Sequence, residues 1–423
     1  MSGVILSGAS LVLPDRILSP GTLIIEDGRI AEIRPGAVRE AHPAFALHGH
    51  YIVPGFIDVH VHGVGGVDTL DGDGSIRSIA ERLPRYGVTA FCPTTVACGP
   101  DPLRAVLAQI RQARETPPRG ARVLPAHLES NFISPEYRGA QPAACLRSPL
   151  GIAGPELRVR IPSTQAAAPG PAHRPANAGD TADVFSAADI MREIDRASPD
   201  VGIVTLAPEL EGALDLIARL VSRGHRVSLG HSGATYEQAL AGMAAGARHA
   251  THLFNRMPPL GHRAPGLAGA ILQTDEIAAE LICDGVHVHP AMLRLAIAAK
   301  HPSRVFAITD GTAAAGLPAG ARASLGGQPI TVRGHAAYLD DGTLAGSVLT
   351  MDRAFQTLVA RVGVSWVDAV TLCATTPARE LGLVGYGILA QDAVADLTVL
   401  DAQFGVVQTY VGGQLVYSRE RPA

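Results

Sequence analysis

Lysine is nearly absent from this chain of 423 residues: Lys300 is the only one, and arginine supplies the other basic side chains. Lys300 ends the apolar, helically periodic stretch MLRLAIAAK, and the C-terminal end of a helix favours a cation. We therefore do not expect a lysine Schiff base or a carboxylated lysine that bridges two metals.

Cysteine is also scarce, and its spacing excludes two common kinds of site. No two cysteines have the two-residue separation of a zinc knuckle or a redox motif. We expect reduced core residues at all five positions, which are Cys92, Cys98, Cys145, Cys283 and Cys373.

Strong net charge and long apolar runs are missing as well. The formal net charge is −4, so the sequence lacks a basic surface for nucleic acid or for an anionic membrane. The first residues show no signal-peptide pattern, and nowhere do eighteen apolar residues follow one another. We expect a cytoplasmic protein with a small polar substrate and with no nucleic-acid or membrane partner.

The sequence does contain β-branched segments that end in polar residues and alternate with helical patterns such as LRAVLAQIRQAR and ALDLIARLVSR. This alternation predicts an α/β fold, a (β/α)₈ TIM-like barrel. A doubly wound sheet is the alternative, but the glycine-rich first turn of a dinucleotide fold is absent. The expected strands lie within residues 56–63, 88–95, 122–130, 202–210, 226–232, 247–255, 278–285 and 304–311.

The two ends of the chain share a different pattern, in which short alternating strands surround turn signals at Asp27-Gly28 and Gly412-Gly413. We expect residues 1–54 and 383–423 to pair into one small β-sandwich domain, with the barrel spanning residues 55–382. Residues 162–183, rich in alanine and proline, predict a flexible insertion in a barrel loop.

The polar strand ends supply candidate metal ligands. His60 and His62 are two residues apart on the first strand, so both imidazoles face the same side and can share a metal. Glu129 ends the third strand, where a buried carboxylate needs a cation. His231 and His252 end the fifth and sixth strands, and imidazole binds zinc, iron and nickel.

Asp310 ends the eighth strand, from which a carboxylate can face a metal-bound water. Alternatives remain for single residues: hydrogen-bonded core histidines, an arginine salt bridge for Glu129 and a turn-forming Asp-Gly for Asp310. The carboxyl ends of barrel strands gather catalytic residues, and together these side chains predict a metal-dependent hydrolase.

The same residues carry a family resemblance over nearly the whole chain apart from the insertion. The segments PGFIDVHVHG, HLE, TLAPE, GHS, ATHLFN, PGLAGAIL, DGVHV, ITDG and GSVLTM resemble the amidohydrolase superfamily and, within it, the N-acetylglucosamine-6-phosphate deacetylases. The HxH pair marks only the superfamily, whereas TLAPE and THLFN followed by PGLAGAIL are more specific to the deacetylases.

The resemblance implies a role for each of these site residues. Glu129, His231 and His252 would hold a catalytic divalent metal, zinc or iron, and His60 and His62 a second one bridged by Glu129. Asp310 would be the general acid and base. The implied substrate contacts are His287 to a sugar hydroxyl and Asn255 with Arg263 to the phosphate, where Arg263 comes from a neighbouring subunit of a homodimer.

Four residues at three places depart from the family pattern. This chain has Ser130-Asn131 where the family usually has Gly-Pro, and Gln141 where it usually has histidine. Both departures are expected at the substrate pocket. Arg256, where a small residue is common, offers a second cation for an anionic group or is a surface arginine.

The resulting hypothesis is removal of acetyl from an N-acetylated amino-sugar 6-phosphate. A metal lowers the pKa of bound water to roughly 7, and Asp310 would take the water proton and return it to the departing amine. The alternatives are deacylation of an unphosphorylated amino sugar or of an N-acyl amino acid, and a noncatalytic barrel that binds a partner.

Overall fold

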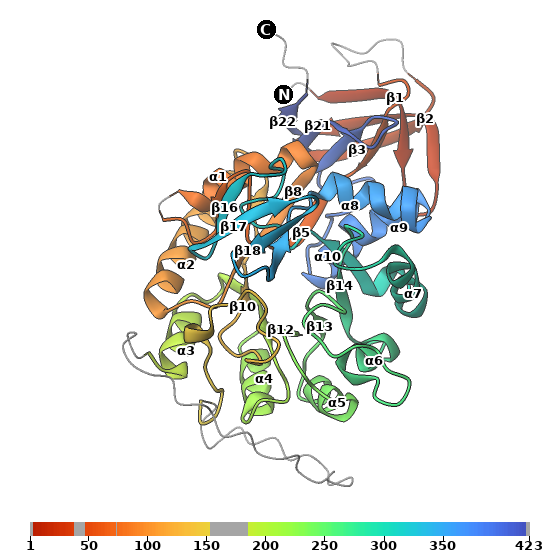
Figure 1. Ribbon diagram of the computed structural model, residues 1–423. Coiled ribbons are helices and arrows are strands. Elements are labelled where there is room, and N and C mark those ends of the chain that lie inside the picture. Colours follow the sequence, from red (N-terminus) through yellow and green to blue (C-terminus); the bar gives the residue numbers. More distant parts are fainter. Residues whose placement is uncertain (1–2, 38–46, 73, 153–184, 420–423) are drawn as a thin grey trace.

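The computed structural model describes residues 3–37, 47–72, 74–152 and 185–419 (Figure 1). The insertion predicted at residues 162–183 lies outside the described residues. Within them, no helix has both the length and the apolar character needed to cross a membrane.

The centre of the molecule is a parallel barrel, which confirms the predicted fold class. Its strands pair with their neighbours in chain order. A parallel bridge between Val61 and Gly311 joins the first strand to the segment that follows the last one, and the His62 amide donates to the Gly311 carbonyl at 2.8 Å. The barrel strands are β5 (Phe56–Val61), β8 (Val88–Thr95), β10 (Ala126–Glu129), β11 (Val201–Leu206), β12 (Arg226–Leu229), β13 (His249–Ala250), β14 (Ala278–Ile282) and β15 (Val305–Ile308), with β9 (Arg122–Val123) beside β8.

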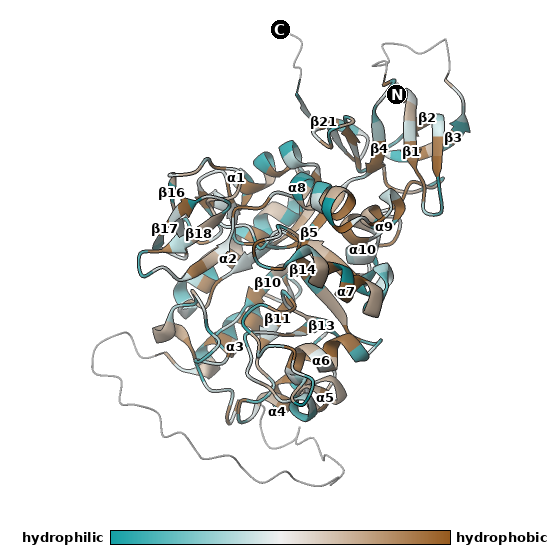
Figure 2. Ribbon diagram, turned by 45° about the vertical axis from the view of Figure 1, so that its right-hand side comes forward, coloured by the Kyte–Doolittle hydropathy of each residue, from teal (hydrophilic) through white to brown (hydrophobic). Residues whose placement is uncertain are grey.

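Amphipathic helices surround the barrel. In α4 the buried residues Ala213, Leu216, Ile217 and Leu220 recur at helical spacing, so one face packs on the strands. Figure 2 shows hydrophobic and hydrophilic residues together on helices such as α7 and α8. The helices are α1 (Ser75–Arg82), α2 (Pro100–Glu115), α3 (Ala187–Arg196), α4 (Ala213–Ser222), α5 (Tyr236–Ala244), α6 (Gly266–Gln273), α7 (Pro290–Lys300), α8 (Met351–Thr357), α9 (Trp366–Val370) and α10 (Thr376–Glu380).

The two ends of the chain form one seven-stranded sheet, which confirms the expected pairing. Leu6, Leu23, Ile52 and Leu397 belong to its separate apolar core. The order is β22-β21-β20-β4-β1-β2-β3, with β1 (Val4–Val12), β2 (Ile17–Glu26), β3 (Arg29–Pro35), β4 (Tyr51–Pro54), β20 (Leu397–Leu400), β21 (Val406–Val411) and β22 (Gln414–Ser418).

A four-stranded antiparallel sheet that is not predicted from the sequence lies between β15 and α8 in the chain (Figure 1). Its own apolar core includes Leu325 and Ile330 and reaches Val96 of the barrel. The Gln328 amide donates to the Ala140 carbonyl at 2.8 Å, which ties the sheet to the loop after β10. The strands are β16 (Arg322–Leu325), β17 (Gln328–Arg333), β18 (Ala336–Leu339) and β19 (Leu344–Ser347), and a small ribbon pairs β6 (Gly63–Val64) with β7 (Val67–Asp68).

Four of the five cysteines are buried, as the sequence predicts, whereas Cys145 is only partly buried. All five are free. Lys300 ends α7 as expected, but it is also fully buried, and its ammonium donates to the Thr274 carbonyl. Burial lowers the pKa of Lys300 to about 8.

Candidate active site

The predicted site residues gather at the carboxyl ends of the barrel strands, where the backbone turns sharply. His231, His252 and Asp310 follow β12, β13 and β15 directly or within two residues, and all have positive φ, at 47°, 30° and 49°. Such a conformation is costly for a residue other than glycine and is typical of functional sites. Here it accompanies strand ends whose side chains converge at the barrel mouth.

Glu129, His231 and His252 form the first cluster of possible metal ligands. One Glu129 oxygen, Oε1, lies 2.6 Å from His231 Nε2 and 2.8 Å from His252 Nε2. The two imidazole nitrogens are 3.1 Å apart. The His231 Nδ1 hydrogen bonds to the Tyr137 carbonyl at 2.8 Å, so its Nε2 is left with a lone pair facing the cluster.

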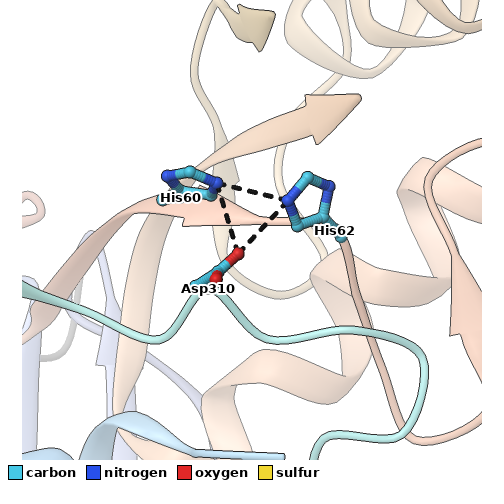
Figure 3. A group of neighbouring side chains, drawn as sticks. All are labelled: His60, His62 and Asp310. Atoms are coloured by element: carbon cyan, nitrogen blue, oxygen red, sulfur yellow. Dashed lines mark hydrogen bonds and ion pairs between the residues drawn. The ribbon is translucent and has the colours of Figure 1, made fainter. Parts of the chain in front are cut away.

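His60, His62 and Asp310 form the second cluster (Figure 3). The Nε2 atoms of the two histidines lie 3.2 Å apart, and Asp310 Oδ1 lies 3.4 Å from the one and 3.3 Å from the other. Both histidines come from the β5 strand end, whereas Asp310 comes from the segment after β15 (Figure 3).

Glu129 connects the two clusters. Its second oxygen, Oε2, lies 3.4 Å from His62 Nε2, and Oε1 lies 3.8 Å from His60 Nε2. Imidazole and carboxylate side chains that are buried close together are suitable ligands for a divalent ion such as zinc or iron. The residues at this site therefore fit a metal ion. In each cluster the candidate ligand atoms all lie within 4.8 Å of one another.

The carboxylates raise the proton affinity of His62. Burial alone would lower the pKa of His62, but Asp310 and Glu129 outweigh it and raise that pKa to about 10. Burial also opposes ionisation of Glu129, yet His231 and His252 hold its pKa well below the ordinary value. A cation is therefore favoured at this place, as either a proton or a metal.

Glu280 is a buried carboxylate that was not among the residues predicted from the sequence. It lies within β14, and its Oε2 is 2.9 Å from His60 Nδ1. The same oxygen accepts the His252 backbone amide at 3.1 Å. Glu280 thus contacts one residue of each cluster. The signal for it is a lone glutamate inside an otherwise apolar strand.

A cavity of about 660 Å³ opens above the two clusters. His60 lies beneath its floor and is completely buried. The predicted residues that line the cavity are His62, Glu129, Gln141, His231, His252, Asn255, Arg256, His287 and Asp310. The antiparallel sheet supplies part of the wall through Leu325, Thr343, Leu344 and Gly346.

Gln141 lines this cavity with a fixed orientation. Its side-chain oxygen accepts the Ala97 amide at 2.7 Å, so its nitrogen faces Glu129 and donates to Glu129 Oε2. An amide does not ionise near neutral pH, unlike the histidine that the family usually has here.

Ser130 and Asn131 do not line the cavity, which corrects the expectation that this departure lies at the pocket. Both are buried, and their side chains bond to the backbone. The Ser130 hydroxyl donates to the Thr205 carbonyl, at 2.5 Å, and the Asn131 amide donates to the carbonyls of Cys98 and Cys145. These substitutions therefore tie the loop after β10 to its neighbours and do not change the cavity wall.

The remaining candidates differ in position. His287 Nδ1 lies 2.6 Å from Asp284 Oδ2, which leaves its Nε2 for the cavity. Arg256 is half-buried and donates to the Leu344 carbonyl at 3.1 Å, so it is not a free surface arginine. Arg263 is exposed and does not line the cavity of its own chain.

Comparison with known proteins adds to this geometry. The profile of the amidohydrolase family matches residues 51–416. An N-acetylglucosamine-6-phosphate deacetylase of Rattus norvegicus is 37% identical, with 98% of this chain and 94% of the relative covered. An N-acetylgalactosamine-6-phosphate deacetylase of Escherichia coli O157:H7 is 33% identical, with coverages of 97% and 98%.

The structural likeness is equally extensive. A mutant N-acetyl-D-glucosamine-6-phosphate deacetylase of Mycobacterium smegmatis, solved in complex with N-acetyl-D-glucosamine-6-phosphate, has a TM-score of 0.83. It is 31% identical, and the match covers 99% of this chain and 100% of the other. Because the family profile spans the barrel and the strands β4, β20 and β21 of the terminal sheet, the chain belongs to the amidohydrolase family.

Proposed function

We propose that this protein removes the acetyl group from an N-acetylated amino-sugar 6-phosphate and releases acetate and the free amine. The observation that carries the proposal is the pair of carboxylate-linked histidine clusters at the barrel mouth, with Asp310 beside them. Relatives of nearly full length that are named for this reaction support the choice of substrate class.

Glu129, His231 and His252 would hold one divalent metal, and His60 and His62, which lie beside Glu129, would hold a second one. When bound, such a metal supplies an activated water and polarises a carbonyl. Glu280 orients His60 through Nδ1, and the Tyr137 carbonyl orients His231 in the same way, so that both present Nε2.

Asp310 moves the proton. Its carboxylate faces the cavity next to both first-strand histidines, where it can accept a proton from the attacking water. It then returns this proton to the amine nitrogen as the amide bond breaks. The same group therefore acts first as base and then as acid.

The polar cavity wall would bind the sugar phosphate. His287, oriented by Asp284, can donate from Nε2 to a sugar hydroxyl, and Asn255 with Arg256 offers donors to the phosphate. Arg263 is exposed in its own chain, and we propose that it completes the phosphate site of a second subunit in a homodimer.

Acetate release tests the proposal. The 6-phosphates of N-acetylglucosamine and N-acetylgalactosamine are compared with the two unphosphorylated sugars and with N-acetyl amino acids. We expect turnover of at least one phosphorylated sugar to exceed that of every unphosphorylated compound. Preference for an unphosphorylated sugar or an N-acetyl amino acid would contradict the proposed substrate class while leaving the metal site and the role of Asp310 intact.

A further inference from the structure

A second cavity, of about 560 Å³, lies at the opposite end of the barrel from the candidate active site. Its lining includes Arg122, Val201 and Arg226, which are the first residues of β9, β11 and β12. The strands point away from it toward the candidate active site. We call it the base cavity.

Arginines give the base cavity its charge, and no acidic residue of the described chain lines it. The lining guanidinium groups belong to Arg114, Arg122, Arg223 and Arg226. Arg122 is neutralised by Asp396, with contacts of 2.9 and 3.1 Å. Arg114 has to share Asp200 with Arg111, whose Nε lies 2.6 Å from that carboxylate. The carboxylates of Asp396 and Asp200 therefore do not neutralise the total positive charge of the arginines.

Arg223 and Arg226 have no acidic partner within ion-pair distance among the residues that the structure describes. Arg223 is exposed and Arg226 is half-buried, and both belong to the turn and strand start that follow α4. The charge of Arg226 reaches into the barrel, because Arg226, after burial and His127, helps to lower the pKa of His249 to about 3.

The rest of the wall is apolar. Val123, Leu124 and Pro125 contribute one part, and Leu381 and Leu383 another. A volume of this size accommodates a small organic ligand, since binding cavities span about 300 to 1,000 Å³. Two unpaired guanidinium groups match the double negative charge of a phosphate monoester, which planar forks bind in a bidentate manner.

We propose that the base cavity binds a phosphate monoester attached to a ring system of nucleoside size. The phosphate lies between Arg223 and Arg226, and the ring system packs against Val123, Leu381 and Leu383. This site is separate from the candidate active site and does not depend on the reaction proposed there.

Calorimetric titration of the full-length, metal-loaded protein with adenosine monophosphate tests the proposal. We expect measurable binding that weakens as salt is added, because the contact is ionic. Arg223→Ala and Arg226→Ala should each weaken the affinity at least tenfold. Arg322→Ala is the matched control, since it removes an exposed arginine from β16 and should leave the affinity unchanged.

Each contrary result has a definite meaning. Absence of binding at millimolar nucleotide, or equal affinity in wild type and both base-cavity variants, overturns the proposal. Weaker binding in Arg256→Ala alone places the nucleotide in the candidate active site and also overturns it. If inorganic phosphate binds as tightly as the nucleotide, the apolar wall adds nothing and the ring-binding half of the proposal is wrong. Melting temperatures of the two base-cavity variants verify that both fold.

Discussion

Asp310 is the residue on which the proposed proton transfer depends. Asp310→Asn keeps the shape of the side chain but cannot accept a proton, so we expect turnover to fall by about 10² to 10⁴. The fold and the bound metal should remain, because Glu129 and the four histidines are untouched. Acetate release and elemental analysis measure the two effects. A variant that retains more than a tenth of wild-type turnover would assign the proton transfer to another group.

Glu280 is a second single residue on which the site depends, and it acts by orienting His60. Glu280→Gln keeps the volume and replaces the carboxyl group that lies next to His60 Nδ1 and accepts the His252 amide. We expect metal affinity to fall by about ten- to a hundredfold, as is typical when such a supporting carboxylate is lost. Dialysis against chelators of graded strength, followed by metal analysis, measures the change.

Glu193→Gln is the control for Glu280→Gln. Glu193 is a buried carboxylate on α3 that binds Arg104, away from the barrel mouth. Its replacement should leave metal affinity unchanged. Equal metal loss in both variants would mean that any buried carboxylate matters equally, and the positioning role of Glu280 would be wrong.

The predicted residues share one property that Glu280 lacks. They lie at or near the ends of apolar segments, and they are His60, His231, His252 and Asp310. Core packing does not call for a polar side chain at such a position, whereas barrel enzymes place their catalytic residues there. Glu280 lies inside its strand, and its partner His60 is 220 positions away in the chain. A contact of that kind depends on strand order and register, which local patterns do not encode.

At the scale of elements, β19 holds the segment that carries Asp310. The Ser347 amide donates to the Asp310 carbonyl at 2.8 Å, and the Thr312 amide donates to the Ser347 carbonyl at 3.1 Å. Gly346 precedes Ser347 in β19 and packs against the Asp310 segment. A Cβ added at Gly346 would lie 2.5 Å from Thr312 Cγ2 and 3.0 Å from the Asp310 carbonyl oxygen. The antiparallel sheet thus fixes the backbone of a proposed catalytic residue.

Gly346→Ala should therefore impair catalysis without removing the metal. A displacement of about 1 Å at a reacting group can cost on the order of a hundredfold in rate, and we expect a loss of about ten- to a hundredfold in kcat. Gly342→Ala is the matched control: its φ is also positive, at 86°, but nothing lies within 4 Å of the new Cβ. Similar kcat values for the two variants would show that β19 does not position Asp310.

The strands of this antiparallel sheet are the secondary-structure elements that could not be predicted from the sequence. The eight barrel strands were predicted because each is a buried apolar segment followed by polar residues and separated from the next by a helix. The strands β16 to β19 are short and only partly buried, so their hydrophobic alternation is weak. Their turns do contain hairpin signals, Gly326-Gly327 and Asp341-Gly342, which are the features that would have revealed them.

At the scale of the whole molecule, the buried Lys300 couples stability to pH. Its pKa is about 8 in the folded chain, below its ordinary value of 10.5, so between these pH values the unfolded chain binds more protons. The free energy of unfolding should rise with pH through this window. Lys300→Met lacks this contribution, which is on the order of 1 to 3 kcal/mol.

Melting curves of wild type and Lys300→Met at pH 7 to 10 test this coupling. We expect the melting temperature of the variant, relative to wild type, to decrease steadily across the range. The comparison of two proteins at each pH removes the titration of all other groups. A constant difference between pH 7 and pH 10 would show that Lys300 keeps its proton throughout.

Burial of the only lysine also determines how the folded protein reacts with amine-directed reagents. Apart from the α-amino group, the chain has a single primary amine, and that amine lies in the interior against the Thr274 carbonyl. Amine-directed dyes, cross-linkers and activated resins therefore have almost nothing to attack on the native surface. Labelling of Lys300 would instead require α7 to open, so the rate of labelling at this side chain measures local unfolding.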